Sequence, residues 1–329
     1  MQHNTILDHY YLELKNNCLA VVVGNHHSQF FIVGYIKYCS TTHEKIWRRG
    51  GDNYERLVKT YTPRVVREYT EWKTYIPFYD SEVPVIPADT ISKIYDPVMR
   101  TLELHSRIQD TLEEIALEFT HEVESNTSVL PGITGSLLPG IHNPSISDLD
   151  FIVYGAKNSL DVIEFISENR DVFQEFKSER LAKWSRDVAI ITGLSPREVV
   201  KFYRNWRRGV FRGKEYSVIY NNGVRGEIFT LPAYKTLGRV KLVVEIRGGL
   251  EALNYPSLSE VLSYKLLEAG IINPFDIGEI LSFEALYIPG LFEGGLFEVN
   301  GLLQCNYIDE SCRIVVGVHE VETNMKYLG

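Results

Sequence analysis

Residues 133–153 read ITGSLLPGIHNPSISDLDFIV, and this stretch decides how the middle of the chain folds. Its second half predicts a β-strand that begins beside Asp148 and Asp150, because an apolar run follows them. Side chains two residues apart on a strand face the same side, so the two carboxylates are expected to project together. Leu149 and Phe151 then face the opposite, buried side of the strand.

The first half of the stretch supplies a Gly-Ser pair, with eleven residues between Ser136 and Asp148. Two carboxylates held side by side repel each other unless a cation lies between them, and hard oxygen ligands suit Mg²⁺ or Mn²⁺. The glycine allows backbone amides to approach phosphate oxygens, and the serine hydroxyl can donate a further hydrogen bond. We therefore predict Asp148 and Asp150 as metal ligands, with Gly135 and Ser136 as nucleotide-binding residues for the same triphosphate.

This combination resembles the nucleotidyltransferase superfamily that includes DNA polymerase beta, CCA-adding enzymes and poly(A) polymerases. The resemblance covers Ile133 to Val153 closely and lies within a predicted domain of residues 94–248. The flanking segments suggest an archaeal-type uncharacterised family with a predicted nucleotidyltransferase domain. The resemblance implies a polymerase beta-like domain with a mixed sheet. Pro139 and Gly140 depart from the pattern, because they lie where family members commonly start a helix, and that helix is expected to be short or displaced.

The chemistry of this superfamily implies a third carboxylate on a neighbouring strand, which binds a second metal ion and helps to deprotonate the attacking hydroxyl. Glu245 is our preferred candidate, because it lies on a predicted apolar strand after a hairpin. The alternative interpretation of Glu245 is an exposed glutamate paired with Lys241 or Arg247. Glu227 is the second candidate and Glu215 a remoter one. Without a third acid, the site could bind a nucleotide without turning it over.

A cluster of cationic residues follows the capping box that begins at Ser195, and the capping box predicts a helix that runs to about Arg208. The cluster interleaves with aromatic residues and comprises Lys201, Arg204, Arg207, Arg208, Arg212 and Lys214. Arginine binds phosphates through paired hydrogen bonds and aromatic rings stack on bases, so the cluster could hold a triphosphate or a nucleic-acid backbone. We take Arg204, Arg208 and Arg212 as candidate nucleotide-binding residues. The alternative is a solvated helix face whose aromatic side is buried.

An α/β (α+β) chain of three domains is expected, with boundaries that give residues 1–93, 94–248 and 249–329. Apolar runs in the first domain favour strands, so we expect an α/β or β-rich domain of unknown role. Asp96 and Pro97 predict the start of a long helix that ends near Ser125. Further predicted elements are a helix over Leu160–Phe176 and strands over Leu149–Val153, Tyr216–Tyr220 and Val240–Ile246. The last domain is expected to be small and β-rich.

The composition describes a compact chain of 329 residues whose net charge is −9, from 34 basic and 43 acidic side chains. This charge weakens binding to a long duplex, so an RNA or tRNA end, a protein hydroxyl or a small molecule is the more readily accommodated acceptor.

The four cysteines form no CxxC pair, which leads us to expect reduced thiols rather than a disulfide framework or a zinc site. No segment is apolar over the ~20 residues of a membrane span, so we expect no membrane partner and a cytoplasmic protein.

The predicted function is Mg²⁺-dependent transfer of a nucleoside monophosphate from a nucleoside triphosphate such as ATP to an acceptor hydroxyl, with release of pyrophosphate. Asp148, Asp150 and Glu245 are the predicted catalytic and metal-binding residues. A catalytically inactive nucleotide- or RNA-binding protein on the same fold is the alternative. A structural or interaction role is a third interpretation.

Overall fold

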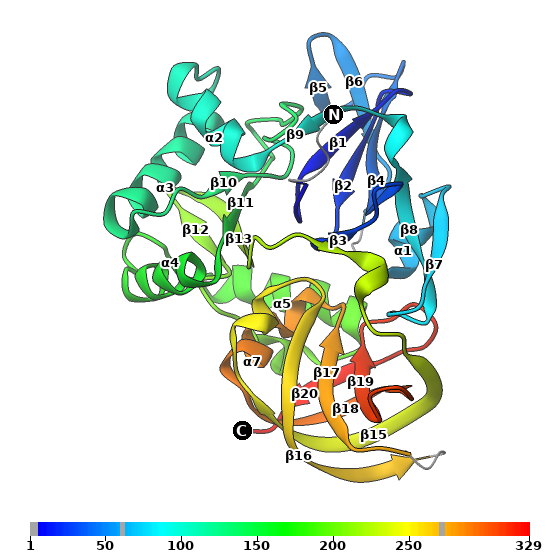
Figure 1. The fold of residues 1–329 in the computed structure, drawn as a ribbon. Coiled ribbons are helices and arrows are strands. Elements are labelled where there is room, and N and C mark those ends of the chain that lie inside the picture. The colour runs from blue at the N-terminus through cyan, green and yellow to red at the C-terminus, as the bar shows by residue number, and fades with distance from the viewer. Residues whose placement is uncertain (1–5, 60–62, 270–273) are drawn as a thin grey trace.

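The computed structural model describes residues 6–59, 63–269 and 274–329, and it has a mixed α+β fold. Three sheet-centred parts follow one another along the chain, with the N-terminal sheet and the C-terminal sheet at opposite ends of the view in Figure 1. The middle part, which carries most of the helices, lies beside both.

The N-terminal part is an antiparallel sheet in which neighbouring strands follow the order β5-β6-β4-β2-β1-β9, and the hairpin β7-β8 is attached to β4. Its strands are β1 (Tyr11–Leu14), β2 (Cys18–Val22), β4 (Phe31–Thr41), β5 (Trp47–Arg49), β6 (Asp52–Arg56), β7 (Lys73–Ile76), β8 (Ser81–Pro87) and β9 (Ile91–Tyr95). The short helix α1 (Pro63–Glu68) lies near β4 and β8. This part is therefore β-rich, which is one of the two architectures predicted for it.

Two disulfides join neighbouring strands, and they correct the expectation of reduced thiols. Cys18 of β2 is bonded to Cys39 of β4, and the two residues are direct partners in the strand register. Cys305 and Cys312 are likewise bonded across a register pair in the C-terminal sheet. No cysteine of the chain is left free. The spacing of the four cysteines in the sequence does not predict either disulfide, because each pairing depends on which strands become neighbours.

The middle part is built on a four-stranded mixed sheet of order β10-β11-β13-β12, in which β11 and β13 are parallel. Its strands are β10 (Gly132–Ile133), β11 (Leu149–Tyr154), β12 (Arg208–Phe211) and β13 (Lys214–Asn221), and its helices are α2 (Pro97–Ser106), α3 (Thr111–Thr127), α4 (Ala156–Glu168), α5 (Ser178–Thr192) and α6 (Pro196–Val200).

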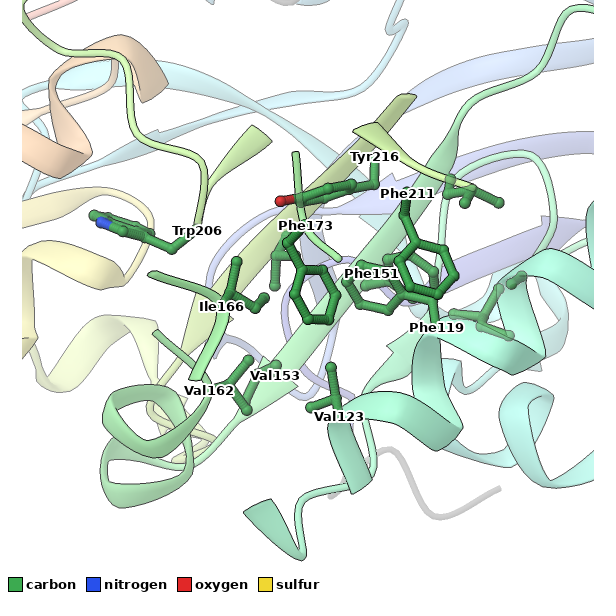
Figure 2. Packing of buried hydrophobic residues seen from close by; sticks show 14 of the residues in the cluster. Phe119, Val123, Phe151, Val153, Val162, Ile166, Phe173, Trp206, Phe211 and Tyr216 are labelled. Carbon is green, nitrogen blue, oxygen red and sulfur yellow. The ribbon is translucent and has the colours of Figure 1, made fainter. Parts of the chain in front are cut away.

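Aromatic side chains form the core of this middle part between the sheet and its helices (Figure 2). Phe119 of α3 stacks on Phe151 of β11, with 4.0 Å between the ring centroids. Phe173, Phe211 and Tyr216 surround Phe119, each at 5.2 Å from its ring. The core therefore holds the buried face of β11 in place and turns the opposite face of the strand away from it.

Three predicted helices differ from the structure. The long helix is divided into α2 and α3, because the side chain of Asp110 caps a new helix by accepting hydrogen bonds from the backbone N–H groups of Leu112 and Glu113. The helix predicted over 160–176 ends at Glu168, and α5 follows it unpredicted. The helix that opens at Ser195 has its predicted capping box but stops at Val200. No described helix has the length and apolar character that a membrane span requires.

The C-terminal part is a six-stranded sheet covered by the short helix α7 (Ile288–Glu293). Its strands are β15 (Lys235–Arg247), β16 (Ser257–Ala269), β17 (Ile277–Ser282), β18 (Gly295–Asn306), β19 (Ser311–Val316) and β20 (Asn324–Tyr327). An additional pairing between β15 and β18 closes a ring of strands. This part is β-rich, as predicted. The sequence-based boundary at 248/249 assigns β15 to the middle domain, whereas its strand pairing joins it to the C-terminal sheet.

A two-residue parallel pairing links the parts: β3 (His26–His27) pairs with β14 (Gly226–Glu227). Next to it, the side-chain amide of Asn25 donates to the side-chain oxygens of Asn221 and Asn222, at 2.7 and 2.9 Å. These hydrogen bonds connect the end of β13 to the N-terminal part. Strands that are distant in the sequence are therefore held close together.

Candidate functional site

Asp150 on strand β11 and Asp148, which directly precedes the strand, both lie at a cavity. Leu149 and Phe151 are fully buried on the core side of the strand, whereas Asp150 is half-buried and Asp148 is exposed. Both aspartates line the cavity, which has a volume of about 850 Å³. The alternation predicted from the sequence therefore holds, and the two carboxylates project to one side.

The Gly-Ser turn lies directly against this pair. The backbone N–H of Thr134 donates to the carbonyl oxygen of Asp150 at 2.9 Å, which fixes the start of the turn on β11. Gly135 follows with φ +63°, and a Cβ at this position would be 2.2 Å from Oδ2 of Asp150. Only glycine combines this backbone conformation with so close an approach. The serine hydroxyl of Ser136 is 3.3 Å from that of Ser147, and residues 135–140 form turns in place of the helix that the superfamily pattern implies.

The electrostatics of the pair reflect its crowding. The negative charge of Asp150 raises the pKa of Asp148 to about 6, and partial desolvation of the carboxyl group at the cavity wall acts in the same direction. The positive charges of Arg208 and Lys37 oppose this rise in pKa. A neighbouring like charge disfavours the ionised form of Asp148 unless a cation compensates it.

Strand β13 contributes a hydroxyl beside the aspartates. Ser217 is the register partner of Asp150 on the parallel strand, and its hydroxyl donates to Oδ1 of Asp150 at 2.5 Å. Ser217 and Ile219 are the β13 residues that line the cavity. The strand adjacent to the aspartates therefore offers a serine and an isoleucine where the superfamily pattern implies a third carboxylate.

The three glutamates considered from the sequence do not line the cavity. Glu245 lies on β15 in the C-terminal sheet, where it accepts a hydrogen bond of 3.0 Å from the hydroxyl of Ser263. Glu227 lies on the short strand β14. Glu215 is on β13 and forms an ion pair with Arg180. The preferred third ligand therefore belongs to a different sheet from Asp148 and Asp150.

The structure disperses the cationic cluster, because the chain does not continue as a helix after Val200. Arg208 lines the cavity at the start of β12. Arg204 instead forms an ion pair with Glu293 of α7, and Arg212 lies 3.4 Å from a carboxylate oxygen of Glu118. Of the three arginines predicted to bind nucleotide, the structure brings only Arg208 to the aspartates.

Several cavity residues carry no local signal in the sequence. Asp8 and His9 precede the first strand, and Lys37 lies on β4 of the N-terminal sheet. Arg207 also lines the cavity and donates a hydrogen bond to the carbonyl of Val218. It belongs to the cationic cluster but was not predicted to bind nucleotide. Burial lowers the pKa of Arg207 to about 10. The parallel pairing that brings Ser217 to the site was likewise not visible in the sequence.

The walls of the cavity come from all three parts of the chain. The N-terminal sheet supplies Tyr38 and Trp47, whose rings lie 5.7 Å apart, together with Lys37. The C-terminal part supplies Tyr255 and Phe283. Aromatic and cationic groups thus share one space with the two carboxylates.

The oxygen ligands at the cavity suit the predicted Mg²⁺ or Mn²⁺ in one arrangement. Asp148 and Asp150 together suit one such ion, because Mg²⁺ is commonly held by one or two carboxylates and completes its shell with water and phosphate oxygens. Within residues 6–59, 63–269 and 274–329, no group of three or more His, Cys, Asp or Glu side chains could enclose an ion. The residues therefore fit one ion shared with a phosphate ligand and do not fit the three-acid set that included Glu245.

Comparison with known proteins adds no relative. No protein-family model, no curated protein and no solved structure matches this chain. The geometry of the residues around Asp148 and Asp150 is therefore the basis for assigning a function.

Proposed function

We propose that the protein is a Mg²⁺-dependent nucleotidyltransferase that moves a nucleoside monophosphate from a nucleoside triphosphate to an acceptor hydroxyl and releases pyrophosphate. The observation that carries this proposal is the contact of Gly135 with Asp150 at the wall of a cavity that also contains Asp148. A site for a metal-bound triphosphate needs a turn that binds the phosphate oxygens and hard oxygen ligands that bind the metal ion.

Each group has a chemical task in this proposal. Asp148 and Asp150 hold the ion, which when bound neutralises the charge of the triphosphate. The backbone of the Gly135–Ser136 turn and the guanidinium of Arg208 orient the phosphates so that the acceptor oxygen can attack the α-phosphorus in line with the leaving pyrophosphate. Positioning and charge stabilisation account for most of the catalysis in phosphoryl transfer.

Turnover of nucleoside triphosphates tests the proposal. The purified protein is incubated with Mg²⁺ and each of the four common triphosphates, in the presence of total RNA, protein or small-molecule hydroxyl acceptors, and pyrophosphate is measured. Asp148→Asn combined with Asp150→Asn should abolish release, because both substitutions keep the side-chain size and remove the charge. Glu245→Gln is the matched control, since its partner Ser263 lies on the C-terminal sheet, and it should retain wild-type turnover.

A second candidate function, binding of a nucleotide without turnover, is favoured by the Ser217 and Ile219 side chains on β13. These residues occupy the cavity-facing positions of the strand next to Asp150. Calorimetry that detects Mg²⁺-dependent nucleotide binding by a protein that releases no pyrophosphate with any acceptor would select this function. Absence of both nucleotide and Mg²⁺ binding would contradict the two candidates together and favour a structural role.

A further inference from the structure

Nucleotidyl transfer requires a group that takes the proton of the attacking hydroxyl, and the residues of β13 that line the cavity include no carboxylate. Ser217 is already committed as a donor to Asp150, and Ile219 has no polar atom. A proton acceptor must therefore come from the charged residues that line the rest of the cavity. One adjacent pair, Asp8 and His9, lies beside the Gly-Ser turn.

The Asp8 carboxylate is completely buried and fixed. Its Oδ1 accepts a hydrogen bond of 2.9 Å from the backbone N–H of Gly24. Its Oδ2 lies 3.0 Å from Nδ1 of His9. Both atoms are buried, and within the described residues neither takes part in a hydrogen bond. A fixed carboxylate this close to one ring nitrogen favours the ring orientation in which that nitrogen faces it.

The side chain of His9 reaches the cavity. Of its two ring nitrogens, only Nδ1 is among the buried atoms without a hydrogen bond in the described residues. The side chain as a whole is 31% exposed and lines the cavity. An imidazole that lies beside a buried carboxylate and lines a cavity is placed where a general base is needed.

The backbone of His9 is held on both sides. Its N–H donates to the carbonyl of Val22 at 3.0 Å, and its carbonyl accepts a hydrogen bond of 2.9 Å from the hydroxyl of Thr134. It adopts φ +61°, a left-handed conformation that is uncommon for residues other than glycine. Such conformations cluster at functional sites, where the surrounding structure maintains them.

Thr134 connects His9 to the paired aspartates. Its hydroxyl contacts the His9 carbonyl, while its backbone N–H donates to the carbonyl of Asp150 at 2.9 Å. Arg207 lines the same cavity, and the charges of Asp150 and Asp8 both act on it. The Asp8–His9 pair and the Asp148–Asp150 pair thus line one cavity and are linked through Thr134.

We propose that His9, positioned by Asp8, is the catalytic base that accepts the proton of the acceptor hydroxyl. This inference rests on the proposed nucleotidyltransferase function. As the hydroxyl oxygen forms its bond to the α-phosphorus, its O–H bond breaks and the proton passes to Nε2 of His9. The bond between the α-phosphorus and the bridging oxygen breaks, and its electron pair leaves with pyrophosphate. The proton on His9 then returns to solvent.

His9→Gly is the most informative variant. Glycine adopts φ +61° without strain, so the fold should be retained, and removal of the ring leaves space for free imidazole. His9→Asn is the second variant, because asparagine also tolerates the left-handed conformation but does not accept a proton near neutral pH. The matched control is His142→Asn, since His142 also pairs with an aspartate, Asp110 at 2.8 Å, but does not line the cavity.

The measurement is pyrophosphate release from radiolabelled ATP with total RNA, together with calorimetric binding of ATP in the presence of Mg²⁺. We expect both His9 variants to lose about 100-fold or more in turnover with little change in ATP affinity. Added imidazole should restore part of the turnover of His9→Gly, and His142→Asn should behave like the wild type.

The outcomes separate this inference from the proposed function. Wild-type turnover by His9→Gly or His9→Asn would overturn the role of His9 and leave the proposed transfer intact. A loss of ATP binding that parallels the loss of turnover would also overturn it, because His9 would then be a binding residue. A wild-type protein that binds ATP but releases no pyrophosphate would overturn the proposed transfer, and the inference with it.

Discussion

Gly135 and Asp150 lie so close together that only glycine fits at position 135: a Cβ there would be 2.2 Å from Oδ2 of Asp150. Gly135→Ala should therefore displace the carboxylate and weaken Mg²⁺-dependent ATP binding at least tenfold, a difference of about 1.4 kcal/mol. Calorimetric titration with ATP in the presence of Mg²⁺ measures this effect.

Gly140→Ala is the control for this substitution. Gly140 has a similar φ of +69°, but no atom lies within 4 Å of its Cβ position. Both variants bear the conformational cost of a left-handed alanine, about 1–2 kcal/mol of stability. Only the first should also lose binding, and equal affinities in the two variants would contradict the role of the Gly135 contact.

The titration of Asp148 should depend on its neighbour. In metal-free protein, the pKa of Asp148 is about 6, raised first by the charge of Asp150, so its carboxyl is protonated below pH 6 and ionised above it. Asp150→Asn should lower that pKa toward the ordinary value of 3.8. Carbon-detected NMR of the Asp148 carboxyl follows the change. Glu245→Gln should leave the titration where it is, and an unaltered midpoint in Asp150→Asn would disprove the coupling.

Arg208 and Arg212 should contribute differently to ATP affinity, because only Arg208 lines the cavity. Arg208→Ala should weaken ATP binding by about tenfold or more, because a charge-assisted hydrogen bond contributes about 1.5–3 kcal/mol. Arg212→Ala removes the same charge from a side chain that is 67% exposed and paired with Glu118, and it should bind ATP like the wild type. Calorimetry at constant ionic strength makes the comparison. Equal losses in both variants would indicate a diffuse electrostatic effect instead of a contact in the cavity.

The buried imidazole of His27 should make the protein sensitive to acid. His27 is completely inaccessible and its Nδ1 accepts a hydrogen bond from the backbone of Val33. Burial lowers its pKa to about 3, with the charge of Arg225 acting in the same direction, whereas an unfolded histidine titrates near 6.5. Between these values the unfolded chain holds a proton that the folded protein does not, so stability is intact above pH 6.5 and falls as the pH decreases toward 3.

Denaturant unfolding between pH 7.5 and 4 tests the contribution of His27. The wild type should lose up to about 1.4 kcal/mol per pH unit more than His27→Asn over this window, since the variant has no group to protonate at this position. Other groups contribute equally to both proteins, so the difference between the two slopes isolates His27. Parallel slopes would show that folding does not lower the pKa of His27.

The two disulfides should contribute unequally to stability. The Cys18–Cys39 bond spans 21 positions of sequence and the Cys305–Cys312 bond spans 7. Chain-entropy estimates give stabilities of about 3 and about 2 kcal/mol for loops of these lengths. Denaturant unfolding of the paired alanine variants, Cys18→Ala with Cys39→Ala and Cys305→Ala with Cys312→Ala, should show the larger loss for the first pair. A thiol assay on the denatured wild-type protein should detect no free thiol.

The local features of the site follow from neighbouring residues in the sequence. The alternation of Asp148, Leu149, Asp150 and Phe151 specifies one polar and one buried face, because a strand has a period of two residues. The Ser195 capping box was predictable for the same reason, since its hydrogen bonds join residues three apart. The lengths of helices were less predictable: Asp110 begins a second helix within a continuous apolar pattern, and capping there outweighs helical periodicity.

By itself, the sequence therefore determined the paired carboxylates, the glycine beside them and the strand-rich character of the flanking parts. The tertiary structure alone decided which distant groups meet them. It brought Arg208 and His9 to the cavity, left Arg204 and Glu245 elsewhere, and joined the cysteines into two bridges. The physical reason is that periodicity and capping act between residues a few positions apart, whereas strand neighbours and cavity walls depend on which buried faces pack together across the whole chain.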